Sequence, residues 1–436
     1  MQKLGCFCLT CQRAGRAYPL RAAAAARLVH HRQQHLATRF HVEIASVEAR
    51  HVPRSMWGNF WQQQKSVRGP SPMNEFPRRG DGWSWYTWPQ GVVVVRVTLA
   101  DGTTGLGYSE DGIGAATLMV NAHLGRIATG LDATATEQIW EQMYRSSIVY
   151  GRKGAAIEAI SAIDIAIWDA IGKSAGKPVY QLLGGPSGKT VRAYASKVQP
   201  DDDLREVRRM ARDYAERGYT GVKANFPFGP ADGRSGLLAN LRYIEAIREE
   251  LDDHIELMSD AYMGWDRPFA TAMLRGLAGL GLRWVEEPLV PDDIFGHALL
   301  RDLGLVPIAT GEHEFTRHGF QQLLDARAAD VLQPDVHRVG GITELRRVCQ
   351  MASGSGIEVI PHVYSAATLH VVLSQPNCGW TEHLTNPSYW GAGRRVDPLF
   401  LGEPEVRDGT PELPTAPGIG LTINPKALPD LADWQD

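Results

Sequence analysis

The 436-residue sequence has few cysteines, no long apolar run and no excess of basic residues. Only Cys349 and Cys378 lie beyond the first eleven positions, which argues against a disulfide framework and predicts a reducing, cytoplasmic compartment. No stretch approaches the roughly 18 apolar residues of a membrane span, so we expect no membrane association. A formal net charge of −4 lacks the basic footprint of nucleic-acid binding. These absences favour chemistry on a small molecule.

The first 42 residues lack any Asp or Glu but contain seven Lys and Arg residues. Such a composition is typical of a transit peptide, and it also fits a start codon assigned too early or a disordered tail. Residues 1–40 are therefore predicted to be an extension outside the fold. The CxCxxC pattern at Cys6 has no matching second cluster, so a structural metal there is the less favoured interpretation.

Residues 41–185 are predicted to form an α+β capping domain. The segment 41–52 alternates as a strand does, and Asp101-Gly102 is typical of a hairpin turn. Residues 115–180 carry apolar side chains at helical spacing. The aromatic segment 56–89, interrupted by Pro and Gly, shows no period, and so long a loop in a compact domain is usually functional or disordered.

Residues 186–385 change to short apolar runs separated by amphipathic helices. Each run but the last precedes a helical pattern, and the eight runs begin near residues 191, 221, 255, 283, 306, 330, 357 and 378. This alternation predicts an α/β fold with a (β/α)7β barrel of the TIM type. Residues 386–436 are rich in Pro and Gly and are predicted to pack back on the capping domain.

Acidic residues stand at the predicted carboxyl ends of three consecutive barrel strands. Asp260, Glu286 and Glu312 are separated by 26 residues each, which is one strand and one helix. Active sites of TIM barrels lie at this end. Neighbouring carboxylates repel one another unless a cation neutralises them, and an all-oxygen ligand set favours Mg²⁺. Any one such acid is more often a helix cap or a surface charge, but three in register predict a metal site.

A histidine and an aspartate follow on the next two predicted strands. Asp335 ends the sixth run and His362 the seventh. A carboxylate bonded to an imidazole fixes its tautomer and makes it more basic, as a proton-abstracting base requires. A lone histidine is usually a satisfied interior group, but this pair beside three acids favours catalysis.

Taken together, these residues resemble the enolase superfamily in its mandelate racemase-like subgroup. The resemblance covers about residues 41–436 and rests on the motifs SAIDIAIWDAIGKSAGKPVYQLLGG, SDAY, WVEEPL, TGEHE, LQPDVHRVGGI and IPHVYS. Within the subgroup the sequence is most similar to the rhamnonate dehydratases, through GPADGRSG at 229, the pair Glu312-His313 and DPLFLGEPEVRDG at 397.

The resemblance implies a hydro-lyase with one metal ion. Asp260, Glu286 and Glu312 would bind Mg²⁺, and the Asp335–His362 dyad would remove the C2 proton of a sugar acid such as L-rhamnonate. The enediolate, stabilised by Mg²⁺, would then lose its C3 hydroxyl to give a 2-keto-3-deoxy acid. The resemblance also implies a homo-oligomer and makes Glu287 a residue that supports the metal ligands.

The second barrel strand separates two reaction classes. Racemases of the subgroup carry Lys-x-Lys there, whereas this chain has Lys223 and Asn225, so the second base is missing and a dehydratase is favoured. Lys223 would stabilise developing negative charge or pair with one of the acids. The proton for the leaving hydroxyl would come from His362, from His313, or from a residue of the second strand or of the capping (lid) domain. Glu382, on the eighth strand, would hydrogen-bond the enediolate if protonated.

Substrate contacts are expected from the capping domain, which we also call the lid, above all from its segment 56–89, and from the second barrel strand. The candidate residues are Trp57, Arg78, Arg79, Arg152 and Asn225. Three alternatives stay open: a racemase, epimerase or cycloisomerase with the same metal site; a dehydratase of another aldonic or aldaric acid; and a non-catalytic binding protein on the same fold. The run GLGYSEDG at 105 lacks the strand-turn-helix context of a dinucleotide site.

Overall fold

The structure is a computed structural model that describes residues 42–53, 69–72, 91–384 and 399–434. Residues Glu43–Asp436 form one compact unit. The predictions for the N-terminal extension and for most of the long aromatic loop fall outside the described residues, and the domain boundaries stay predictions. Among the described helices, none has the length and apolar character needed to cross a membrane.

The described chain begins with a three-stranded antiparallel sheet in the order β1-β2-β3. The strands are β1 (Ile44–Pro53), β2 (Gly91–Leu99) and β3 (Thr104–Glu110). The run of four valines in β2 is buried almost completely, because the sheet packs against helices. Gly102 turns the β2–β3 hairpin with a φ of 88°, a conformation that glycine adopts without strain. The predicted hairpin is confirmed.

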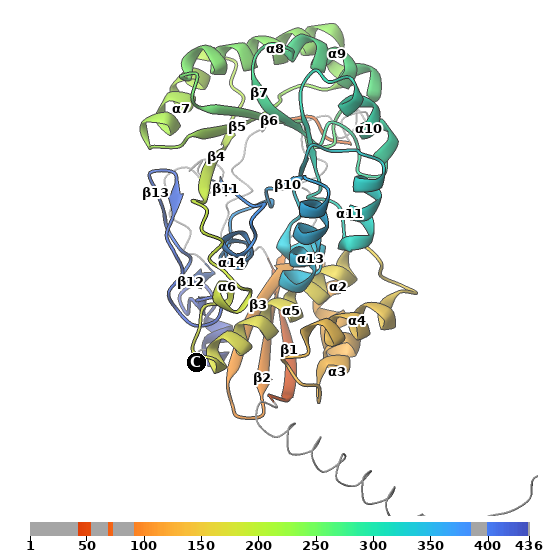
Figure 1. The fold of residues 1–436 in the computed structure, drawn as a ribbon, viewed down its shortest axis with the longest axis vertical. Helices are drawn as coiled ribbons and strands as arrows, with labels where there is room; N and C mark the ends of the chain where they lie inside the picture. The colour runs from red at the N-terminus through yellow and green to blue at the C-terminus, as the bar shows by residue number, and fades with distance from the viewer. Residues whose placement is uncertain (1–41, 54–68, 73–90, 385–398, 435–436) are drawn as a thin grey trace, which may run out of the picture. The chain divides into compact units, whose positions relative to one another are not determined.

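Helix α5 (Ala155–Ser174) covers one face of this sheet (Figure 1). A Cβ atom on Gly105 or Gly107 of β3 would lie 2.1 Å from a carbonyl oxygen of α5, so only glycine permits this close approach. The other helices of this part are shorter. They are α2 (Ala115–Met119), the π-helix η3 (Val120–Leu124), α3 (Gly125–Ala128), α4 (Thr136–Ser147) and α6 (Val179–Leu182).

The C-terminal segment packs on the same helix. Asp169 of α5 accepts hydrogen bonds from the backbone N–H of Ile419, at 2.7 Å, and of Leu106, at 2.8 Å. The small elements of this segment are β12 (Phe400–Leu401), β13 (Val406–Arg407), β14 (Thr410–Pro411), β15 (Thr422–Ile423) and the 3₁₀ helix η5 (Pro429–Trp434). A buried carboxylate thus joins two parts of the capping structure that are far apart in the chain.

Eight parallel strands form the second sheet, in the order β10-β9-β8-β7-β6-β5-β4-β11. The strands are β4 (Arg192–Val198), β5 (Gly221–Asn225), β6 (Glu256–Asp260), β7 (Leu282–Glu286), β8 (Ile308–Thr310), β9 (Val331–Leu332), β10 (Glu358–Val359) and β11 (Trp380–Leu384). All eight fall on the predicted apolar runs. Pairing of the last strand with the first curls the sheet, which confirms the TIM-type (β/α)7β barrel.

Helices follow the first seven barrel strands and lie outside the curled sheet (Figure 1). They are α7 (Leu204–Glu216), the 3₁₀ turn η4 (Pro230–Asp232) with α8 (Gly233–Glu250), α9 (Arg267–Leu277), α10 (Ile294–Asp302), α11 (Thr316–Asp325), α12 (Val336–Val339) with α13 (Gly341–Gly354), and α14 (Ala366–Ser374). Side chains of Asp203, Asp266, Asp293 and Ser365 accept the first free N–H groups of four of these helices. These caps fix the residues at which the four helices begin.

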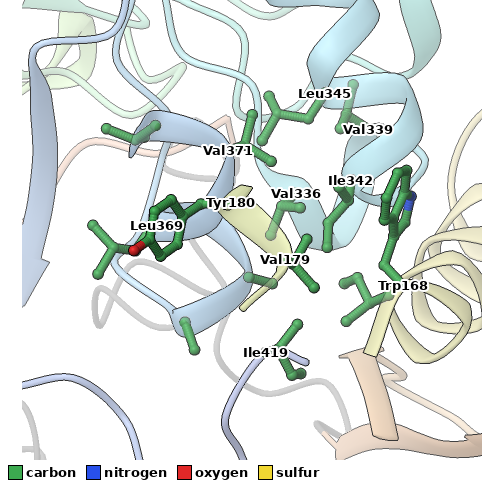
Figure 2. Packing of buried hydrophobic residues seen from close by; sticks show 14 of the residues in the cluster. Trp168, Val179, Tyr180, Val336, Val339, Ile342, Leu345, Leu369, Val371 and Ile419 are labelled. Atoms are coloured by element: carbon green, nitrogen blue, oxygen red, sulfur yellow. The ribbon is translucent and has the colours of Figure 1, made fainter. Parts of the chain in front are cut away.

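A shared apolar core joins the capping helices to the barrel helices. Figure 2 shows Trp168 of α5 and Val179 of α6 packed near Val336 and Val339 of α12, with Ile419 of the C-terminal segment beside them. All five side chains are buried. The short helix α12, which begins at a predicted catalytic residue, is therefore anchored in the core on one side.

Candidate active site

The carboxyl ends of the barrel strands carry an unusual backbone. Four non-glycine residues just beyond these ends adopt positive φ, namely Tyr262, Met263, Glu287 and Val363. Such conformations cost free energy and tend to cluster at functional sites. The φ of 40° at Glu287 turns its side chain away from that of its neighbour Glu286, so two consecutive acids reach different partners.

The three predicted metal ligands stand at this end of the barrel. Asp260 and Glu286 are paired positions on the neighbouring strands β6 and β7, and Glu312 follows the end of β8. All three side chains are buried. Burial first, and then the negative charge of Glu286, raise the pKa of Asp260 well above its ordinary value. The cluster therefore stores electrostatic repulsion that a cation would relieve.

Lys223 of β5 is buried between two of the acids. Its Nζ atom lies 2.6 Å from Glu286 Oε1 and 2.9 Å from Glu382 Oε1. Although burial works to lower it, these two carboxylates hold the pKa of Lys223 well above its ordinary value, so the ammonium stays charged. The structure thus matches the interpretation in which this lysine pairs with the acids.

Glu286 has further donors on its other oxygen. Trp284 Nε1 and Gln333 Nε2 donate to Oε2 at 3.1 Å and 2.7 Å. Asn225 Nδ2 donates to Asp260 Oδ2 at 3.0 Å, which places the residue that replaces a second lysine beside a predicted ligand. The Oδ1 atom of Asn225 is buried and has no hydrogen-bond partner among the residues that the structure describes. A buried oxygen without a described partner, on an amide that is bonded to Asp260, fits a site for an oxygen-coordinated cation such as Mg²⁺.

The predicted dyad is formed. His362 Nδ1 lies 2.8 Å from Asp335 Oδ2, and His362 Nε2 lies 3.4 Å from Glu312 Oε2. Burial works to lower the pKa of His362, but the nearby carboxylates of Glu312, Asp335 and Glu382 raise it to about 9. The second oxygen of Asp335 accepts from the backbone N–H of His337 and caps α12, so the carboxylate is held in place from two directions.

A second histidine–carboxylate pair lies on the other side of Glu312. His313 Nδ1 is 2.9 Å and 3.0 Å from the two oxygens of Glu287 and 3.7 Å from Glu312 Oε1. Its Nε2 atom is 3.5 Å from the hydroxyl of Tyr262. Burial works to lower the pKa of His313, but the carboxylate of Glu287 raises it above its ordinary value.

The group of described residues whose ligand atoms lie close enough together to hold a metal is not the predicted set. Among the described residues, Glu287, Glu312 and His313 have ligand atoms within 4.8 Å of one another. That set shares only Glu312 with the predicted set of Asp260, Glu286 and Glu312. We favour the predicted set, because the two oxygens of Glu287 already hold the His313 ring and because Mg²⁺ prefers oxygen to nitrogen ligands.

One part of the sequence interpretation does not fit the structure. Glu382 was expected to donate a hydrogen bond if protonated. Burial works to raise the pKa of Glu382. Lys223, His362 and the hydroxyl of Ser196 nevertheless hold this pKa below its ordinary value, and the hydroxyl donates to Glu382 at 2.5 Å. The carboxyl is therefore ionised, and it acts as an acceptor that fixes the lysine.

The expected substrate contacts are only partly described. Trp57, Arg78 and Arg79 lie outside the described residues. Arg152 is exposed in the loop before α5. Its neighbour Lys153 is ion-paired with Glu314 Oε1 at 2.8 Å, and this pair brings the loop to the segment that carries two of the site residues.

A fragment of the lid, residues 69–72, lies over loops that follow two barrel strands. A Cβ atom on Gly264, after β6, would stand 2.4 Å from Pro70 Cβ, and one on Gly229, after β5, would stand 3.1 Å from the same atom. These glycines allow the lid to approach the barrel mouth closely. The contact supports the expectation that the lid helps to form the substrate site.

Sequence reasoning missed two residues that hold the site. Gln333 donates to Glu286 and stands two positions before Asp335, so its place on the same strand edge was available from the spacing. Arg338 stands three positions after Asp335 and contacts Glu110 of β3, a residue 228 positions away. That pairing left no local signal in the sequence.

Two family models match the chain. "Mandelate racemase / muconate lactonizing enzyme, N-terminal domain" matches residues 87–184, and "Enolase C-terminal domain-like" matches residues 206–427. Together with the barrel and its acidic mouth, these matches define the class of protein. The chain belongs to the mandelate racemase-like family of the enolase superfamily.

Particular relatives narrow the comparison. The chain is 38% identical over 339 residues to L-rhamnonate dehydratase of Saccharopolyspora erythraea. The matched region covers 77% of this chain and 84% of that protein. The crystal structure of rhamnonate dehydratase from Gibberella zeae complexed with Mg is similar with a TM-score of 0.79 and 30% identity, over 89% of this chain and 96% of that one. A racemase from Streptomyces coelicolor A3(2) with bound magnesium follows with a TM-score of 0.74 and 28% identity, over 89% and 99% of the two chains.

Proposed function

We propose that this protein is a Mg²⁺-dependent hydro-lyase that dehydrates an aldonic acid, L-rhamnonate or a close relative, to the 2-keto-3-deoxy acid. The observation that carries the proposal is the imidazole of His362, which is held by Asp335 and lies 3.4 Å from Glu312 at the barrel mouth. The name of the relative from Saccharopolyspora erythraea supports the reaction, and the magnesium in the Gibberella zeae structure supports the cofactor.

Asp260, Glu286 and Glu312 are the residues that would hold the metal. Their burial and mutual repulsion favour a bound dication, and Lys223 offsets part of the charge of Glu286. When bound, Mg²⁺ supplies positive charge that draws the substrate carboxylate to the site and makes the C2 proton more acidic. A cation there would also offset the carboxylate charge that raises the pKa of His362.

His362 is the base that takes the proton from C2. Its Nδ1 atom donates to Asp335, so in the neutral form of the ring the lone pair is on Nε2, which faces Glu312. Loss of this proton gives the enediolate, whose electron pair then expels the C3 hydroxyl. The fixed tautomer orients the base and avoids reorganisation during the reaction.

His313 is the acid that gives a proton to the departing C3 hydroxyl, so that water leaves. Glu287 holds its Nδ1 atom and favours the protonated ring, as a general acid requires. The alternative is that His362 returns the proton it has taken. These two routes differ in one observable: without His313, a His362 route would retain full dehydration.

A racemase is the nearest rival function, because a structural relative with bound magnesium bears that name. Racemisation needs a second base on the opposite face of the substrate. Asn225 stands where that base would be expected, and its amide donates to Asp260. An amide cannot accept a proton at neutral pH, which favours dehydration.

The test is a screen of aldonic and aldaric acids with the purified protein and Mg²⁺. We expect a 2-keto-3-deoxy product, detected by its reaction with semicarbazide, with L-rhamnonate among the best substrates. Epimerised acid without keto product would support the racemase instead. Binding of sugar acids without any turnover would support a non-catalytic protein.

The partners and location belong to the same proposal. The substrate is a small-molecule sugar acid, read by lid residues that include Arg152, and the protein is a cytoplasmic homo-oligomer. Sedimentation velocity at several protein concentrations measures the oligomeric state, and a single species of 48.0 kDa would contradict it.

A further inference from the structure

Strand β3 of the cap contacts the barrel where the proposed base is held. Tyr108 carbonyl oxygen lies 3.0 Å from His337 Nδ1, and the two rings pack with centroids 4.5 Å apart. The hydroxyl of Ser109 donates to the carbonyl oxygen of His337 at 2.6 Å. Glu110 Oε1 lies 2.9 Å from Arg338 Nη2. Three consecutive cap residues thus hold two consecutive residues of α12.

Helix α12 has only four residues, and Asp335 is its N-cap. A helix of this length is not stable by itself, and its position therefore depends on its contacts with the rest of the fold. The apolar contacts come from Val336 and Val339, which Figure 2 shows within the core beside α5 and α6. Polar contacts come from β3 and also from the barrel, where Ser365 Oγ lies 3.3 Å from His337 Nε2. The position of Asp335 is therefore set by the cap as well as by the barrel.

Arg338 joins this contact to the catalytic groups. Its Nη1 atom donates to the carbonyl oxygen of Glu312 at 3.1 Å and lies 3.6 Å from Glu312 Oε1, and its Nε atom lies 3.9 Å from Asp335 Oδ2. The side chain is only 12% exposed, whereas Glu110 on the cap is 55% exposed. One guanidinium thus bridges the cap, a proposed metal ligand and the proposed dyad.

We propose that Arg338 is a positioning residue, anchored by Glu110 of the cap, that aligns the Asp335–His362 dyad with Glu312. This inference rests on the proposed function of the dyad. Arg338 does not touch the reacting atoms. Its part is to keep α12 at the distance from Glu312 at which His362 meets the C2 proton, and a misplacement of about 1 Å in such an arrangement costs about 100-fold in rate.

The experiment compares the full-length protein with three variants in the presence of Mg²⁺. In R338M we expect kcat to fall about 100-fold with KM nearly unchanged, because alignment is lost while the substrate contacts remain. R338K keeps the charge and part of the reach, and we expect it to recover a measurable part of kcat. E110Q keeps Arg338 but weakens its anchor, so it gives a smaller fall, about 10-fold, in kcat alone.

E137Q is the matched control. Glu137 of α4 pairs with Arg347 of α13, which is another ion pair between the cap and a barrel helix, but one with no contact to the dyad. We expect this variant to keep wild-type kcat. Hydrogen exchange, followed by mass spectrometry in metal-free protein, adds a measurement that does not depend on turnover: peptides that span α12 should exchange faster in E110Q and not in E137Q.

The outcomes separate this inference from the proposed function. If the wild type dehydrates sugar acids while R338M and E110Q match E137Q in kcat and in exchange, the positioning role is wrong and the function stands. If R338M raises KM as well as lowering kcat, and R338K restores neither value, Arg338 serves the general stability of the fold and the inference is also overturned. A wild type with no activity on any sugar acid overturns the proposed function itself.

Discussion

Two histidine–carboxylate pairs flank Glu312, and they are built differently. His362 is bonded to one oxygen of Asp335, whose other oxygen caps a helix, whereas His313 faces both oxygens of Glu287. The carboxylate of the first pair is anchored by a backbone that the cap holds, and that of the second stands on a strained residue with a φ of 40°. This difference fits the two roles proposed above, with His362 as the base and His313 as the acid.

Replacement of His362 by Asn gives the largest expected effect. The imidazole is the proposed base, so we expect dehydration to fall about 10⁴-fold and exchange of the C2 proton with D₂O to stop. Both are measured by ¹H NMR on the same sample. Mg²⁺ binding should persist, as followed by tryptophan fluorescence. Exchange at the wild-type rate in this variant would assign the base to another residue.

Replacement of His313 by Asn tests the other half of the comparison. We expect dehydration to fall about 100-fold while C2 exchange continues, because the acid is lost and the base remains. The two variants therefore differ in exchange and not only in rate. Full dehydration in H313N would show that His362 returns the proton, and the second pair would then serve only to shape the site.

The consecutive glutamates give a smaller effect that separates the two metal sets. E286Q removes a proposed ligand, and we expect Mg²⁺ affinity to fall at least about 10-fold. E287Q removes the partner of His313, and we expect Mg²⁺ affinity to change little. Isothermal titration with Mg²⁺ measures both. The reverse order of affinities would move the metal to the cluster of Glu287, Glu312 and His313.

The sequence predicted the place of these residues better than their partners. Strand-end acids repeat with the period of one strand and one helix, so Asp260, Glu286 and Glu312 could be assigned to one barrel mouth. The pairing of Lys223 with an acid, here Glu286 and also Glu382, was only one of two interpretations, because strand order places residues on an edge without deciding which atoms meet. The protonation of a carboxyl group depends on those atoms, which is why the sequence could give Glu382 a donor role only on the condition that it is protonated, a condition that its lowered pKa does not meet.

The sequence could not predict the contact between Glu110 of the cap and Arg338 of α12, for a different reason. Glu110 and Arg338 are each ordinary surface residues by pattern, and only the packing of α12 against β3 brings them together. The close lid contact at Gly264 is similar, since no periodicity relates Pro70 to a loop after the third barrel strand. Long-range contacts of irregular segments leave no sequence period.

The smallest expected effect concerns stability and pH in the metal-free protein. His362 has a pKa of about 9 in the fold and an ordinary value of 6.5, so its pairing stabilises the fold fully below pH 6.5, and this contribution is lost as pH rises through 9. D335N removes one of the causes of the raised pKa. Its Tm should therefore fall further below that of the wild type at roughly pH 6 than at roughly pH 9.5.

E287Q provides the parallel measurement for the second pair, because Glu287 is the largest cause that raises the pKa of His313. Each unit of pKa difference corresponds to about 1.4 kcal/mol, so both variants should show a difference in Tm that narrows as pH rises. Asn is as good an N-cap residue as Asp, so D335N should keep the cap of α12, and the change in its Tm difference with pH reports the pairing with His362. A Tm difference for D335N that is the same at both pH values would mean that Asp335 does not raise the pKa of His362.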